Sequence, residues 1–506
     1  MVEKISIILI LFRQIVLNKI NSKWLTKKNV CVREIMDIDR LVSASKELKE
    51  EEYCMSNVPQ KLDKNKSEIY KNAPIAKFGE RKPDFTTMGR KIKNPHKKFR
   101  EVVCVEACRT PYGKAGGALK DFSAMELGAM AIKEVLRRTE GKVQPGDVDY
   151  IFMGQVVPAG CGQIPGRQAT ILAGVPESVP SITVNKVCSS GIKTIDLAFQ
   201  MILLGRADIC IAGGQESMSN CPFVLPDMRW GARMGLPNGR VVDAMVYDGL
   251  WDAFYNRHMA IHGSEVADEF GFTREDQDEW ALNSQHSAVK AMNEGKLDAE
   301  IFPVEVKQGK KVTVMDKDEG PRPETTLEAL AKLPPVFGHL STVTGKPGSV
   351  TAGNAPGVND GGDVCLLMSR EKADELGLKP IFTIVDYAEV SQPTKDIATV
   401  PGLAIKKILE QNDMTLDQMD IIEINEAFAA VALVSCRSIL GMTKEEMYKK
   451  VNVNGGAVAY GHPIGATGAR IAMTLGYELK RRGGGWGVCG ICSGHAQGDA
   501  MLIHVD

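Results

Sequence analysis

The spacing of apolar residues after residue 100 predicts strands and helices in alternation. A β-branched run at residues 182–184 is followed by apolar residues at helical spacing through residue 203, which indicates a strand, a tight turn and a helix. A charged helical pattern covers residues 273–296 and opens with the capping-box sequence Thr273-Arg274-Glu275-Asp276. The run at residues 102–105 is typical of a strand, so we expect folded structure to begin there. Residues 40–98, polar and rich in lysine, are typical of a loosely attached linker.

The pattern occurs twice in the same order. Residues 131–136 match residues 404–409. Asp149 stands 18 positions after residue 131, and Asp420 stands 16 positions after residue 404. Asn185 then stands 36 residues after Asp149, and Asn454 stands 34 residues after Asp420. Each half continues with a helical pattern and a strand, at residues 209–214 and 487–492. We therefore predict a duplicated α/β core with an insert at about residues 220–345, where long insertions usually build a substrate pocket.

Charge separates the first hundred residues from the rest. They carry 23 Lys and Arg against 12 Asp and Glu, although the 506-residue chain has a net charge of −1. We predict a basic N-terminal extension over residues 1–99; a targeting segment, an unstructured tail and a misjudged translation start all fit this composition. The stretch up to Arg33 loosely resembles a mitochondrial transit segment. Residues 40–48 come near a peroxisomal targeting sequence, but Glu47 stands where His or Gln is expected. We expect the mitochondrial matrix, with the cytoplasm as the alternative.

Cysteine usage and hydropathy exclude several other classes of protein. The 12 cysteines follow no disulfide rhythm, and several, such as Cys104, Cys210 and Cys436, lie in apolar runs typical of buried thiols in a reducing compartment. Cys489 and Cys492 form a C-x-x-C, but no second pair stands at zinc-site spacing. No apolar stretch approaches the roughly 20 residues that cross a bilayer. No motif supports nucleic-acid binding.

Cys188 is the strongest candidate for chemistry. It follows the predicted strand at 182–184, and we expect it in the first turn of the following helix. Backbone N–H groups there lack partners and carry partial positive charge, which would lower the pKa of the thiol and favour the thiolate. The loops at residues 461–463 and 492–494 supply a histidine and a second thiol for an acyl-transfer site.

Short motifs in a fixed order then resemble the thiolase family from about residue 100 to the end, most closely its acetoacetyl-CoA thiolases. The matching segments are residues 185–191, 212–219, 425–428, 452–457 and 461–468, followed by the loop at Cys492. The resemblance implies a duplicated αβαβα layered fold. It also implies an N-terminal domain over residues 100–368, including the insert, and a C-terminal domain over residues 369–506.

The resemblance also implies roles for individual residues. Cys188 would accept the acyl group, His462 would activate it, and Cys492 would move a proton at the α-carbon of the second acetyl group. Asn425 would hold a water with His462 in one oxyanion hole, and the N–H groups of Cys188 and Gly494 would form another. Neither a metal nor an organic cofactor is expected.

Coenzyme A contacts rest on thinner resemblances, and the chain departs from the family pattern near them. The expected contacts are His258, Met259, Arg322, Ala355, Pro356 and Gly357. Residues 260–265 differ from the usual Gly and Thr-Ala-Glu pattern, and Pro356 replaces a common serine. His495 and Ala496 replace the usual glycines after Cys492. The walls of the pocket are therefore less defined by sequence than the catalytic set.

The predicted function is acetyl-CoA C-acetyltransferase, which condenses two acetyl-CoA to acetoacetyl-CoA through an acetyl-cysteine and also runs in reverse. The first alternative is a 3-ketoacyl-CoA thiolase of β-oxidation with broader chain length. A ketoacyl-ACP synthase is disfavoured by the second thiol and the segment at 425–428, and a catalytically inactive CoA- or lipid-binding scaffold by the complete catalytic set. The resemblance implies a homo-dimer or homo-tetramer, without nucleic acid or stable membrane insertion.

Overall fold

The computed structural model describes residues 99–229, 231, 240–309, 311–338, 345 and 347–506. The predicted N-terminal extension therefore lies outside the described residues, apart from Phe99. The strand expected at residues 102–105 is confirmed, because the first described strand, β1, begins at Val102.

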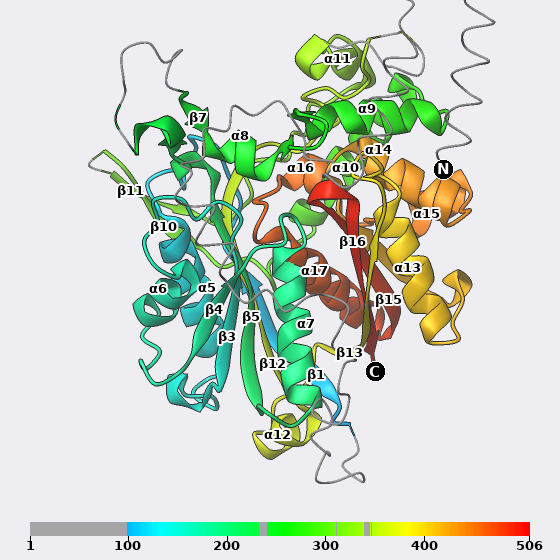
Figure 1. Ribbon diagram of the computed structural model, residues 1–506. Helices are drawn as coiled ribbons and strands as arrows, with labels where there is room; N and C mark the ends of the chain where they lie inside the picture. The colour runs from blue at the N-terminus through cyan, green and yellow to red at the C-terminus, as the bar shows by residue number, and fades with distance from the viewer. Residues whose placement is uncertain (1–98, 230, 232–239, 310, 339–344, 346) are drawn as a thin grey trace, which may run out of the picture. The chain divides into compact units, whose positions relative to one another are not determined.

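Strands from the two predicted halves join edge to edge in one mixed sheet (Figure 1). Their order is β14-β15-β16-β13-β1-β12-β5-β3-β4, with β2 paired to β12. β3 runs parallel to β4 and β5, and β14 runs parallel to β15, while the other neighbours are antiparallel. The strands span Val102–Arg109 (β1), Gly113–Lys114 (β2), Tyr150–Gly154 (β3), Ser181–Val184 (β4), Ile209–Ser217 (β5), Asn359–Ser369 (β12), Phe382–Ser391 (β13), Ile421–Ile424 (β14), Gly485–Ser493 (β15) and Gln497–Val505 (β16).

Helices cover both faces of each half of the sheet. Helices α7 and α17 pack against each other and against the strands of both halves, which makes them the central layer. Helices α5 and α6 cover the outer face of the first half, and α13 covers that of the second (Figure 1). The predicted duplicated αβαβα arrangement is confirmed. The helices span Ala124–Arg137 (α5), Pro165–Leu172 (α6), Ser190–Leu203 (α7), Arg370–Glu375 (α12), Val400–Gln411 (α13), Ala429–Leu433 (α14), Lys444–Lys450 (α15), Ala457–Tyr460 (α16) and Thr467–Arg482 (α17).

Where the structure describes the predicted insert between the halves, it carries short hairpins and the helices α8 to α11. Its long helix begins after an N-cap at Thr273, whose side chain and that of Asp276 form the predicted capping box. In Figure 1, α9 lies near α14 and α16, at the end of the sheet where the candidate catalytic loops emerge. The elements span Phe223–Val224 (β6), Val242–Asp243 (β7), Ala244–Gly249 (α8), Trp251–Asp252 (β8), Arg257–His258 (β9), Met259–Glu269 (α9), Arg274–Asn293 (α10), Val304–Gln308 (β10), Lys311–Met315 (β11) and Leu327–Ala331 (α11).

Glycines allow the two central helices to begin side by side. A Cβ atom on Gly191 would lie 2.6 Å from the carbonyl oxygen of Ala466, and one on Gly468 would lie 2.4 Å from the backbone nitrogen of Ile192. Both distances are shorter than real contacts, so neither position accepts a side chain without movement. The start of α7 and the loop before α17 are therefore in direct backbone contact.

The described cysteines behave as the sequence predicts. The ten in the described part of the chain are all free thiols, and those in apolar runs, such as Cys104, Cys210 and Cys436, are fully buried. Among the described helices, none is both long and apolar enough to cross a membrane.

Candidate active site

Cys188 lies in a strained turn between β4 and α7. The helix begins at Ser190 with Ser189 as its N-cap, so Cys188 precedes the helix, and the expected position in its first turn is wrong. Val187 adopts a φ of 46°, a left-handed conformation that is costly for a β-branched residue. The Ser190 hydroxyl accepts from Lys186 N at 2.8 Å and donates to Val187 O at 2.7 Å, which closes the turn around the thiol.

The Cys188 sulfur is held as a thiol, which contradicts the expected thiolate. The residue is only 5% exposed, and this burial raises the pKa of its thiol to about 12. Its own backbone N–H stabilises the anion, but the loss of hydration outweighs that contribution. The thiol therefore needs a base to take its proton at neutral pH.

His462 presents a free basic nitrogen. The Thr467 hydroxyl donates its single proton to Pro463 O at 3.0 Å, so it must accept from His462 Nδ1 at 2.7 Å. This assigns the proton to Nδ1 and leaves the lone pair on Nε2, a buried atom with no partner among the described residues. Burial, with a further contribution from Arg470, lowers the pKa of His462 to about 3. The imidazole is therefore neutral.

The loop that carries His462 is fixed against the first half. His462 N donates to Asn359 Oδ1 on β12 at 3.1 Å. A Cβ atom on Gly214, near the end of β5, would lie 2.0 Å from Gly465 O. Together with the contact between Gly191 and Ala466, this places the loop beside the start of α7, next to the turn of Cys188.

Cys492 lies near the end of β15 and is 1% exposed. Burial raises the pKa of its thiol well above the usual value, and the nearby Cys188 raises it further. A Cβ atom on Gly494 would lie 2.8 Å from Val187 Cγ2, so the loop after Cys492 packs directly on the turn of the first thiol. The structure thus brings Cys188, Cys492 and Gly494 together from opposite halves.

Asn425 follows β14, the strand parallel to β15. Its backbone N–H donates to Gly490 O at 2.9 Å, which ties it to the strand of Cys492. Its side-chain nitrogen and oxygen are both buried without a protein partner among the described residues. Because buried amides in proteins normally have partners, this one is suited to hold a water or a substrate oxygen.

Glu426, the next residue, was not assigned a role from sequence. Its buried carboxylate accepts from Trp280 Nε1 at 3.0 Å, Ser284 Oγ at 2.8 Å and Asn452 Nδ2 at 2.9 Å. It also accepts from Val458 N at 3.0 Å. These donors come from α10 and from the segment before the loop of His462, so Glu426 supports the site rather than facing it. The acidic residue within the 425–428 motif was the sequence feature that could have indicated this supporting role.

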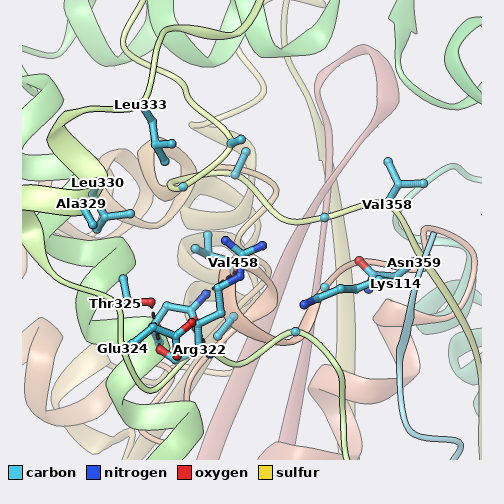
Figure 2. Close-up of a pocket in the computed structure, with 18 of the residues that line it drawn as sticks. Lys114, Arg322, Glu324, Thr325, Ala329, Leu330, Leu333, Val358, Asn359 and Val458 are labelled. Atoms are coloured by element: carbon cyan, nitrogen blue, oxygen red, sulfur yellow. Dashed lines mark hydrogen bonds between the residues drawn. The ribbon is translucent and has the colours of Figure 1, made fainter. Parts of the chain in front are cut away.

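A cavity of about 440 Å³ lies next to the loop that carries His462 (Figure 2). Of the six predicted coenzyme A contacts, Arg322, Ala355 and Gly357 line it, together with Lys114, while the other three are not part of its lining. Gly461 and Asn359 also line it, which connects the cavity to the backbone of His462. Two cationic side chains, Lys114 and Arg322, therefore line the cavity, whereas the side chains of Cys188, His462 and Cys492 are not part of its lining.

The remaining predicted contacts lie elsewhere around the site. His258 caps α9 by accepting from Ala260 N at 3.1 Å, and burial lowers its pKa to about 4. Met259 belongs to the apolar cluster that contains Cys492. Pro356 is half-buried between two lining residues. The departures at His495 and Ala496 both adopt positive φ angles, 57° and 51°.

No group of three or more His, Cys, Asp or Glu side chains suited to a metal ion occurs in the described ranges. The C-x-x-C pair lies on β15, where Cys489 is fully buried and pairs with Glu423 and Met501 in the sheet register.

Comparisons with known proteins identify the class. The family model described as "Thiolase, N-terminal domain" matches residues 102–371, and "Thiolase, C-terminal domain" matches residues 378–505. The chain belongs to the thiolase family and is an acyltransferase.

The chain is also similar to individual proteins and solved structures of this family. It is 45% identical to acetyl-CoA acetyltransferase of Syntrophomonas wolfei over 404 residues, 80% of this chain and 99% of that protein. It is 46% identical to that of Cupriavidus necator over 404 residues, with the same coverage. The structure of Bacillus anthracis acetyl-CoA acetyltransferase superposes with a TM-score of 0.75 at 40% identity, covering 80% of this chain and 99% of that one. Human mitochondrial 3-ketoacyl-CoA thiolase gives 0.75 at 36% identity, again over 80% and 99%.

Proposed function

We propose that this protein is an acetyl-CoA C-acetyltransferase, which forms acetoacetyl-CoA and free coenzyme A from two acetyl-CoA and catalyses the reverse thiolysis. The observation that carries the proposal is the combination of a buried thiol at Cys188 with a neutral His462 whose Nε2 has no partner among the described residues. The names of the relatives support the two-carbon substrate.

In the first half-reaction, His462 Nε2 takes the proton of Cys188, and the sulfur attacks the carbonyl carbon of acetyl-CoA. The C–S bond to coenzyme A then breaks, and the imidazolium returns the proton to the leaving thiolate. The backbone N–H groups of Cys188 and Gly494 stabilise the oxyanion of the tetrahedral intermediate. Acetyl-Cys188 and free coenzyme A result.

In the second half-reaction, the neutral His462 takes the proton of Cys492 and returns it at the end, and the resulting Cys492 thiolate removes an α-proton from a second acetyl-CoA. The carbanion attacks the acetyl group, the bond to Cys188 breaks, and the proton on Cys492 passes to the departing sulfur. Asn425, with a water and His462, stabilises the enolate oxygen. No metal or organic cofactor is needed, since the thioester itself acidifies the α-carbon.

Coenzyme A occupies the cavity in this proposal, with Lys114 and Arg322 near its phosphates. The enzyme works as a homo-dimer or homo-tetramer in the mitochondrial matrix, with the cytoplasm as the alternative compartment. The positive balance of the first hundred residues supports an organellar address.

Mass measurement after incubation with acetyl-CoA tests the acyl-enzyme. We expect one acetyl group on the peptide that contains Cys188, and none in Cys188→Ala, whose condensation rate should fall by a factor of about 10⁴ or more. Acetyl transfer at an unchanged rate in that variant would refute the proposal.

A chain-length series separates the second candidate, a 3-ketoacyl-CoA thiolase, which the likeness to the human mitochondrial enzyme keeps in view. Thiolysis of acetoacetyl-CoA should exceed that of six- to sixteen-carbon 3-ketoacyl-CoA. A higher kcat/KM for the long substrates would favour the alternative.

A further inference from the structure

Lys186, two residues before the nucleophile, is bonded to the opposite half of the molecule. Its ammonium donates to Asp499 Oδ1 on β16 at 2.6 Å and to Glu389 on β13. The Asp499 side chain is fully buried, and that of Lys186 is 15% exposed. The turn of Cys188 belongs to the first half, so this ion pair crosses between the halves.

The backbone of Lys186 is held as firmly as its side chain. Its carbonyl oxygen accepts from the Ser493 hydroxyl, one residue after Cys492, and its N–H donates to Ser190 Oγ at 2.8 Å. Lys186 therefore contacts β15, the strand of the second thiol, through its main chain, and the neighbouring strand β16 through its ammonium.

Asp499 is the centre of this contact. Its Oδ1 atom accepts from Lys186 and from the Tyr387 hydroxyl, while its Oδ2 atom has no partner in the described part of the chain. In the sheet register it faces Ile491, one residue before Cys492. Burial raises the pKa of Asp499, and Lys186 opposes that shift. The negative charge of Asp499 in turn contributes to the raised pKa of Cys492.

We propose that Lys186 and Asp499 are a positioning pair that holds the turn of Cys188 against the strand of Cys492 and sets the charge beside the second thiol. The proposal rests on the proposed function, because it matters only if both thiols act in one reaction. A buried carboxylate that loses its close cation is strongly unfavourable, so we expect the ion pair between Lys186 and Asp499 to persist through the reaction. Neither residue lines the cavity, which separates this role from substrate binding.

Three lysine variants of the full chain test the positioning role. Lys186→Met should lower kcat for condensation by about 10- to 100-fold with KM changed less than about threefold, because misplacement of about 1 Å costs up to 10²-fold. Lys186→Arg, which keeps the cation, should recover most of that loss. Lys193→Met is the matched control, since Lys193 also binds Glu389, at 3.2 Å, but is within reach of Asp196 rather than Asp499. It should keep wild-type kcat within about twofold.

Asp499→Asn tests the charge. The titratable groups that face Asp499 are Lys186, Tyr387, the Cys492 thiol and Glu389, its partner in the register of β13 and β16. Removing a negative charge and leaving Lys186 in place both favour the Cys492 thiolate. The alkaline-rising limb of the pH–rate profile for condensation should therefore move to lower pH, while the limb for acetyl exchange with free coenzyme A moves less. A merely structural role would lower both rates and leave the limb in place.

Equal effects of Lys186→Met and Lys193→Met, or an unmoved limb in Asp499→Asn, would overturn the inference. Failure of the proposed function would already appear in the wild type as an absence of acetyl transfer. The two outcomes are therefore distinguishable.

Discussion

The two halves of this enzyme share one scaffold but carry different chemical groups at the same place. Strands β5 and β15 occupy corresponding positions next to their central helices, and each has nine residues. The eighth residue is Glu216 in β5 and Cys492 in β15, and both side chains are buried. The duplication thus supplies two equivalent strand ends, of which one carries a buried acid and the other the proposed proton carrier.

The connections to the central helices differ in the same way. Five residues join β4 to α7, and the turn holds Cys188 by strain and by Ser190. In the second half, fifteen residues separate Val451, which forms only a single bridge to Ile422, from α17. That longer connection carries His462 and depends on Glu426 and on close glycine contacts. A short turn fixes a nucleophile by itself, whereas a long loop needs support from other elements.

Among the variants that separate the roles of the two halves, removal of the second thiol has the largest expected effect. Cys492→Ala should lower condensation by about 10²- to 10⁴-fold, the range for a lost proton carrier, while acetyl-Cys188 still forms. Quenched-flow mass measurement of the acetyl-enzyme and a spectrophotometric condensation assay read the two steps separately. If condensation proceeds at the wild-type rate, the second half has no proton carrier at Cys492, and the ketoacyl-ACP synthase alternative gains support.

A substitution of Glu426, which holds the long loop in place, should lower the stability of the protein as well as its reaction rate. Glu426→Gln turns an NH₂ group toward donors that now bind the carboxylate, which leaves buried groups unpaired and lowers the free energy of unfolding by about 3 kcal/mol. Glu445→Gln, on the exposed first turn of α15, is the matched control and should change it by less than about 0.5 kcal/mol. Denaturant unfolding measures both. A loss below 1 kcal/mol in Glu426→Gln would show that the loop is held by its glycine contacts alone.

Glu216 gives the first half its own pH dependence. Burial raises its pKa from 4.5 to about 7, although hydrogen bonds from the backbone N–H groups of Val156, Val157 and Gly465 oppose this shift. Since the folded pKa is higher than the unfolded one, the stabilisation is complete below pH 4.5 and is lost as the pH rises toward 7. The loss is on the order of 3 kcal/mol for a shift of this size.

Glu216→Gln should therefore flatten the fall in unfolding free energy between pH 4.5 and 7 relative to the wild type. Urea titrations at several pH values measure the slope. An identical slope in wild type and variant would assign the pH dependence to other buried acids, such as Glu423, whose pKa burial raises to about 8.

Sequence patterns were sufficient for the layers but not for charge states, and the catalytic roles of the residues that the structure brings together stay predictions. The periodicity of residues 182–203 predicts the strand and helix around Cys188, yet the cap at Ser189 is set by local geometry, which moves Cys188 out of the helix. The expected thiolate fails because the degree of burial is a tertiary property, and its effect on the thiol exceeds that of the helix start. The contacts of Glu426 and Lys186 join residues far apart in sequence, so no local pattern could predict them.

The smallest expected effect comes from relieving the backbone strain at His495. Val187 before Cys188 and His495 after Cys492 both adopt left-handed backbone angles, and the His495 ring contacts Phe254 edge-on with centroids 5.1 Å apart. His495→Gly would remove a backbone penalty of about 1–2 kcal/mol. It would also lose the ring contact, about 0.5–1.5 kcal/mol, and gain unfolded-state entropy of about 0.4–1 kcal/mol. In the Phe254→Ala background the contact is already gone, so the same substitution should stabilise the protein by up to about 1.5 kcal/mol. Thermal unfolding of the four proteins in this cycle measures it, and destabilisation in the Phe254→Ala background would show that His495 makes other contacts that outweigh its strain.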